Sequence, residues 1–351
     1  MDNSFFIRSD QENLKMERFH ICSWEFSSSS LVEFGLEIDS SSIENLNNLS
    51  MDLYVPWAKK STELSDFYHK LKKSDNSRFI FNDSVYKTSY LDDGQNRQGV
   101  IHEFSGRNKL CLLPVQFDHN HEIGKITLNI DLTEYRKRTD IKANVYLRIG
   151  IEPSTESIAT RKKGIGKSTI IYDIKMNESR NIPDQLLDEF KKTKACHLKT
   201  CFCFHIVPNS YNITFFESEH LKNVRTLEFK PFKNYLDDKR LKKNELMVVF
   251  SKKSGSESYS FFTIFSKERI GASQFAIAIL INIICGFLFA FPAIRKAIPQ
   301  SENLSTILKS PPLEFYIAVF LAFWLVFYFF IPPILSAIRR WWIKVKSFIN
   351  W

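Results

Sequence analysis

The chain has 351 residues, which allows about two domains of ordinary size. A composition of 44% hydrophobic and 25% charged residues excludes a disordered chain, and 11 Gly with 12 Pro exclude a collagen-like or linker-dominated one. The net charge of +9 is unevenly placed, because residues 271–351 hold seven Lys or Arg and two Asp or Glu. More than half of the excess therefore lies in the last 81 residues, where it bears on topology and hardly on a nucleic-acid ligand.

The first 25 residues are rich in charge and have no apolar run. They include Arg8, Asp10 and Lys15, so they do not read as a secretory signal. We therefore expect residues 1–270 to form a domain that stays in the cytosol. The cysteines of this region are too few and too scattered for a dense disulfide framework, and we expect them to be reduced.

The segment from about 19 to 265 reads mainly as β-strands. Residues 32–38, 126–132 and 145–151 alternate apolar and polar residues, which is typical of half-buried antiparallel strands. Many short strands at regular spacing favour an antiparallel β-sandwich or barrel-like domain over a doubly wound sheet. Whether residues 1–270 form one domain or two stays open. Further predicted strands are 19–26, 78–81, 100–104, 110–117, 169–174, 200–207, 213–216, 224–229, 246–250 and 259–265.

Two short helices are also predicted in this region. Ser61 or Thr62 can cap a helix with Leu64 and Leu71 on its apolar face. Pro183 suits the first turn of a second helix.

Two motifs resemble functional sites without fitting them. Residues 164–169, Gly-Ile-Gly-Lys-Ser-Thr, end like a phosphate-binding loop, but Arg161 stands where the pattern requires Gly, and a strand follows instead of a helix. We interpret them as the basic tip of a hairpin. Cys201, Cys203 and His205 lie at strand spacing, too far apart for a single zinc ion, so buried cysteines are favoured.

Four basic clusters remain in the β-rich region. If several converge in space, they could bind anionic lipid, nucleic acid or a nucleotide; otherwise they are solvated faces. The clusters are residues 136–138, 161–167, 191–199 and 239–243.

Residues 271–351 are predicted to form a transmembrane hairpin. Two stretches, Gly271–Ile294 and Phe315–Ile338, are free of charge and long enough to span a bilayer as helices. The predicted spans are at about 273–294 and 313–335. Lys or Arg is more frequent on the two outer flanks than in the connecting loop, which places both termini on the cytoplasmic side. The predicted localisation is thus the cell inner (plasma) membrane, as a multi-pass protein.

Each predicted span has a patterned face. The first carries small residues that include Ala276, Gly286 and Ala290, with Asn282 beside them. The second carries an aromatic stripe that includes Phe320, Phe323 and Phe327. Small residues and buried Asn both favour close helix contacts in lipid. Two interpretations stay open: the helices pack on each other, or one face mediates self-association.

A β-rich domain followed by a two-helix hairpin resembles, by layout only, the two-transmembrane effectors of bacterial antiphage defence systems of the retron or cyclic-oligonucleotide type. The resemblance implies a cytosolic part that senses or is held by a partner and a hairpin that disrupts the inner membrane. No motif carries over ligand-binding residues from these families.

The sequence thus predicts a membrane-anchored effector, with a membrane-tethered scaffold or binding protein as the alternative. No catalytic motif is recognisable, so neither an enzyme nor a cofactor or metal is expected. The expected partners are the lipid bilayer, a second copy of the chain, and a regulatory protein, nucleic acid or nucleotide.

Overall fold

The computed structural model describes residues 3–26, 29–58, 60–92, 98–138, 142–153, 158–163, 167–243, 246–268 and 271–297, together with residues 316, 319, 320 and 323. The chain divides into two compact units. The first comprises Met1–Lys163 and Ser168–Lys267, and the second comprises Gly164–Lys167 and Glu268–Trp351.

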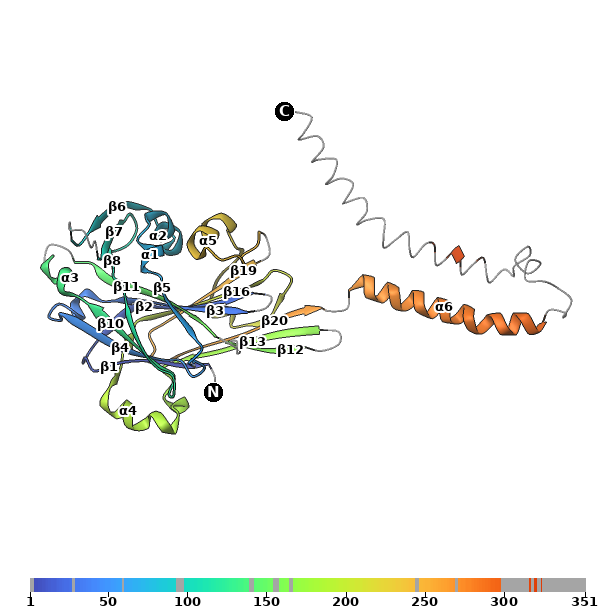
Figure 1. Cartoon of the computed structure of the whole chain (residues 1–351), viewed down its shortest axis with the longest axis horizontal. Coiled ribbons are helices and arrows are strands. Elements are labelled where there is room, and N and C mark those ends of the chain that lie inside the picture. The colour runs from blue at the N-terminus through green and yellow to red at the C-terminus, as the bar shows by residue number, and fades with distance from the viewer. Residues whose placement is uncertain are drawn as a thin grey trace, which may run out of the picture. The chain divides into compact units, whose positions relative to one another are not determined.

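The first unit contains two large β-sheets (Figure 1). In the described part of the chain, one sheet has nine strands, with β12 beside β13 and β14 beside β1. Its strands in spatial order are β17 (Asn212–Phe216), β20 (Tyr259–Glu268), β13 (Lys167–Met176), β1 (Ser4–Ser9), β4 (Asn48–Tyr54), β10 (Lys125–Asp131) and β9 (Gln116–Asn120), with β12 (Ala159–Lys163) and β14 (Lys194–Ala195) at the side.

The other sheet has eleven strands among the described residues, with β15 beside β2 and β5 beside β11. In spatial order they are β18 (Leu221–Thr226), β19 (Leu246–Ser254), β16 (Thr200–Pro208), β2 (Lys15–Glu25), β3 (Ser30–Ile38), β11 (Asn144–Glu152), β8 (Leu110–Leu112), β7 (Val100–Phe104) and β6 (Val85–Tyr90), with β15 (His197–Leu198) and β5 (Glu63–Asp66) at the side.

The main hydrophobic core lies between the two sheets. Its buried members alternate along strands of both sheets, for example Leu49 and Leu53 on β4 and Phe34 and Leu36 on β3. The ring of Phe5 on β1 meets that of Phe34 edge to face, with centroids 5.3 Å apart. Alternate residues of these strands point into the core that the two sheets share, which explains the alternation of apolar and polar residues in the sequence. The prediction of a mainly β fold is confirmed.

The sheets are mixed, and the prediction of antiparallel sheets is wrong in this respect. The parallel strand pairs among the described residues include β1 with β13, β2 with β15, β2 with β16, and β8 with β11. Alternation reports which face of a strand is buried and carries no information about the direction of its neighbour. The β12–β13 pair is an antiparallel hairpin, so the phosphate-loop-like residues lead into a strand, as predicted.

Short helices cover the outer faces of both sheets. The eleven-stranded sheet carries α1 (Tyr68–Leu71), α2 (Ser74–Phe81) and α5 (Phe229–Leu236), which enclose a second hydrophobic cluster with Trp24, Leu112 and Ile206 (Figure 1). Phe190 of α4 (Leu187–Lys192) packs on the nine-stranded sheet against Phe6. The remaining short helices are α3 (Thr133–Lys137), η1 (Ser40–Ser42), η2 (Ser179–Asn181), η3 (Asp184–Leu186) and η4 (Ser218–His220).

Two local predictions are wrong. The segment 78–81, expected as a strand, forms the last turn of α2. The helix expected after Thr62 begins as strand β5, and only residues 68–71 are helical.

The second unit contains α6 (Ala272–Ala297), a helix of 26 residues. None of the helices in the described part of the chain is both long enough and apolar enough to cross a membrane. This finding contradicts the predicted localisation as a multi-pass inner-membrane protein. Helix α6 includes the polar residues Gln274 and Asn282 and, near its end, Arg295 and Lys296. Most of the second predicted span, at about 313–335, lies outside the described residues.

Candidate functional site

A cavity of about 350 Å³ lies on the outer face of the eleven-stranded sheet, between the strands and helices α2 and α5. Pockets of roughly 300–1,000 Å³ hold small-molecule ligands in proteins. Its lining comes from β2 (Arg18, His20, Cys22), α2 and the following residue (Phe79, Ile80, Phe81, Asn82), Arg107, Arg148, β16 (Phe202, Phe204, Ile206), β18 (Lys222, Asn223, Arg225), Phe232 of α5, and β19 (Val248, Phe250).

Phenylalanines form most of the apolar lining. On β16, period two places Cys201 and Cys203 in the core between the sheets and Phe202 and Phe204 on the outer face. Phe204 stacks on Phe250 of β19, with ring centroids 4.5 Å apart and planes at 4°. The strands thus present flat rings to the cavity, and α2 and α5 contribute Phe79, Phe81 and Phe232.

The polar lining is cationic. Five Arg or Lys side chains line the cavity, and among the described residues no Asp or Glu does. Three carboxylates outside the lining, Glu33, Glu37 and Glu228, contact four of the five. The five cations are Arg18, Arg107, Arg148, Lys222 and Arg225.

Arg148 is held by a buried ion pair. Its Nε and Nη2 each lie 2.5 Å from Oε2 of Glu33, and the Tyr235 hydroxyl donates to the same oxygen at 2.9 Å. Burial alone would lower the pKa of Arg148, but the attraction of Glu33 together with that of Tyr235 and Tyr146 outweighs it, so the pKa rises well above its ordinary value. Arg148 is therefore a fixed positive charge at the floor of the cavity.

Arg107 is buried and only partly satisfied. Its side chain is 7% exposed, and Nη2 donates to Oε2 of Glu37 at 2.6 Å. The guanidinium lies over the rings of Phe81 and Phe104, at 4.8 and 5.3 Å from their centroids. Its Nε has no hydrogen-bond partner among the described residues. A buried donor without a partner is costly.

His20 is uncharged at neutral pH. Burial, reinforced by the cations Arg148 and Arg107, holds the pKa of His20 well below its ordinary value. Its Nδ1 lies 3.1 Å from the hydroxyl of Tyr146, which also accepts from Nη1 of Arg148 at 3.3 Å. The neutral imidazole therefore joins the hydrogen-bond network without adding charge.

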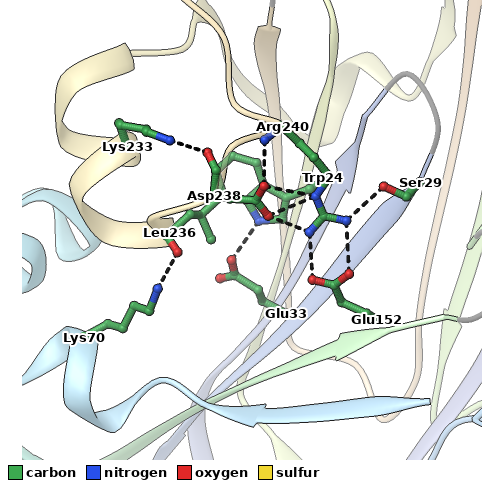
Figure 2. A network of polar contacts seen from close by, with 9 residues as sticks. All are labelled: Trp24, Ser29, Glu33, Lys70, Glu152, Lys233, Leu236, Asp238 and Arg240. Atoms are coloured by element: carbon green, nitrogen blue, oxygen red, sulfur yellow. Dashed lines mark hydrogen bonds and ion pairs between the residues drawn. The ribbon is translucent and has the colours of Figure 1, made fainter. Parts of the chain in front are cut away.

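A polar network fixes helix α5, one wall of the cavity, against the sheet (Figure 2). Arg240, just after α5, forms a two-pronged ion pair with Glu152 at 2.7 and 3.0 Å and a second pair with Asp238. Lys70 donates to the carbonyl of Leu236, the last residue of α5. Several contacts from separate elements thus hold this wall in place (Figure 2).

The predicted site residues lie elsewhere. Ala276, Asn282, Gly286 and Ala290 belong to α6, where Ala276 is buried and Asn282 and Gly286 are exposed. Phe320 and Phe323 are helical and exposed, and Phe327 lies outside the described residues. Their role in packing or self-association stays a prediction.

The cysteines predicted to be buried are confirmed as such. Cys196, Cys201 and Cys203 are buried and free. No group of three His, Cys, Asp or Glu suited to a metal ion occurs among the described residues.

No protein-family model matches this chain, and no curated protein matches it either.

Proposed function

We propose that the β-rich unit is a sensing module that binds a nucleotide in the cavity on its outer face. The observation that carries the proposal is the combination of Phe side chains with five Arg or Lys side chains in a lining without carboxylates. This is the sensing half of the effector hypothesis. Membrane disruption depended on two spanning helices and forms no part of the proposal.

The aromatic side suits a nucleobase. Stacking of a base on an aromatic side chain contributes about 1–3 kcal/mol per base. The coplanar rings of Phe204 and Phe250 line the cavity and can stack with such a base.

The cationic side suits phosphate. Arg donates in a planar fork that matches phosphate oxygens, and four of the five cations of the lining are arginines. After Glu33, Glu37 and Glu228 are counted, the five cations of the lining exceed the carboxylates that contact them by two. A ligand with two or more negative charges would balance this excess.

The first prediction concerns affinity. Calorimetric titration of the purified full-length chain should detect ATP or GTP binding, and adenosine or guanosine should bind at least about tenfold more weakly because they lack phosphate. Replacing two exposed cations, Lys222→Gln with Arg225→Gln, should weaken nucleotide binding by a similar factor.

The matched control is Arg136→Gln with Lys230→Gln, which removes the same charge from exposed positions outside the cavity and should leave the affinity unchanged. Arg107→Gln tests the buried donor. Failure of all nucleotides to bind, or equal weakening by both double variants, would overturn the proposal.

A further inference from the structure

A second cavity of about 350 Å³ lies where ends of the two sheets come together. Strands β2, β16 and β19 of the eleven-stranded sheet and β12, β13 and β20 of the nine-stranded sheet contribute to its lining. It shares no lining residue with the first cavity.

Two of the basic clusters identified in the sequence converge here. Arg161 and Lys162 come from β12, and Arg240 and Lys242 come from the loop between α5 and β19. Lys267, at the end of β20, is the fifth cation of the lining. Pairing of β12 with β13 brings Lys162 opposite Thr169, and Ser168 and Thr169 of the phosphate-loop-like motif are part of the lining.

The positive charge is only partly compensated. Arg161 pairs with the buried Glu25, which is itself part of the lining, and Arg240 pairs with Glu152 and Asp238. By contrast, Lys162, Lys242 and Lys267 have no ion pair with any carboxylate that the structure describes.

Exposed lysines are ordinarily solvated, but the geometry here is concave. Several like charges around one cavity reinforce each other's potential and attract counter-charge. Ser168, Thr169 and Ser210 add hydroxyl groups to the lining, which can donate to anionic oxygens.

We propose that this second cavity binds a compact polyphosphoryl group, meaning two or more adjoining phosphates. Three lysines without described counter-charges match an anion of that charge, and an enclosed space of about 350 Å³ suits a compact anion better than a nucleic-acid duplex. The group could be free polyphosphate or the phosphate tail of a nucleotide, and the experiment separates these two sources.

The test uses the purified full-length chain with tripolyphosphate, ATP and AMP as probes in calorimetric titrations at fixed ionic strength. We expect Lys242→Gln with Lys267→Gln to weaken tripolyphosphate binding about tenfold, because two cations leave the cavity. The control, Lys191→Gln with Lys192→Gln, removes the same charge from exposed positions on α4 and should change it less than about twofold.

The outcomes separate this site from the first one. Arg107→Gln should leave tripolyphosphate binding intact, even where it abolishes nucleotide binding in the first cavity. In the Arg107→Gln variant, competition of ATP but not AMP with tripolyphosphate would show that the cavity also accepts the phosphate tail of a nucleotide. If neither ATP nor AMP competes, the ligand of the cavity is free polyphosphate. Absence of tripolyphosphate binding, or equal weakening by the two lysine pairs, would overturn the inference.

Discussion

His205 shows how the core between the sheets responds to acid. Its ring is fully buried and stacks on Tyr172, with centroids 4.2 Å apart. Nδ1 lies 3.0 Å from the Ser23 hydroxyl and Nε2 lies 3.5 Å from the Cys203 sulfur, and no carboxylate of the described residues bonds to the ring. Burial therefore lowers the pKa of His205 to about 3.

The pH dependence of stability follows from this shift. Below its ordinary pKa of 6.5, the unfolded chain binds a proton at His205 and the folded chain does not, so folding stability falls from pH 6.5 towards pH 3. Between pH 7.5 and pH 5 this one residue should remove about 2 kcal/mol from the free energy of unfolding.

Urea unfolding of the native chain and of His205→Gln at both pH values measures the effect. The free energy of unfolding of the variant should fall by about 2 kcal/mol less than that of the native chain over this interval. His20 and His102, whose pKa values are also lowered by burial, contribute to the pH dependence of both proteins. The same loss in both proteins would contradict the assignment.

The buried pair of Arg148 and Glu33 makes a second prediction at this scale. Arg148→Met should lower the free energy of unfolding by about 3–5 kcal/mol, because the fully buried Glu33 would lose its counter-charge. The double variant Arg148→Met with Glu33→Gln should recover a large part of this loss in urea unfolding. If the double variant is as unstable as the single one, the cost arises from packing instead of charge.

At the scale of elements, helix α5 depends on contacts outside itself. It has only eight residues, and a helix this short is marginal in isolation. Lys70 of α1 donates to the carbonyl of Leu236 at the C-terminal end, where backbone carbonyls are unpaired and a cation is favoured.

Lys70→Met should therefore loosen α5. A loss of about 1 kcal/mol corresponds to amide hydrogen exchange about fivefold faster in residues 229–236. Lys73→Met, an exposed lysine in the same region, is the control and should leave this exchange unchanged. Unchanged exchange in Lys70→Met would show that packing of Tyr235 and Leu236 alone holds the helix.

The elements that build the first cavity were the hardest to predict from the sequence. Strands such as β3, β10 and β11 have clean alternation and were predicted, because one face of each meets the core. Residues 78–81 have β-forming aromatic and branched side chains, yet tertiary packing makes them the end of α2. Helix α5 was not predicted; its Pro231 lies in the first turn, where proline is tolerated.

One signal in the sequence did point to the cavity. Residues 201–204 read Cys-Phe-Cys-Phe, and alternation on a strand requires that one pair face away from the core. Large aromatic side chains on the outer face indicate that something covers it. The cysteines of this segment were considered as metal ligands and burial was favoured, whereas it is Phe202 and Phe204 that line the candidate site.

At the scale of the whole molecule, net charge and local charge give different answers. The near balance of basic and acidic residues before residue 271 gives hardly any evidence for a nucleic-acid ligand. The fold nevertheless gathers five cations in the lining of each of two cavities. In the first cavity, the paired carboxylates Glu33 and Glu37 lie outside the lining. Such convergence depends on which strands are neighbours, and the parallel pairs in both sheets are not readable from periodicity.

The parallel pairing of β2 with β16 also constrains how the chain is made. Ser23 and His205 on these neighbouring strands are 182 residues apart in the sequence, while β3 follows β2 directly and can pair with it at once. At a synthesis rate of about 5–20 residues per second, one edge of β2 waits roughly 10–40 s on the ribosome for its partner. During that interval the edge exposes unpaired backbone groups beside Phe19 and Ile21, so nascent chains that stop before residue 200 should require a chaperone to stay in solution.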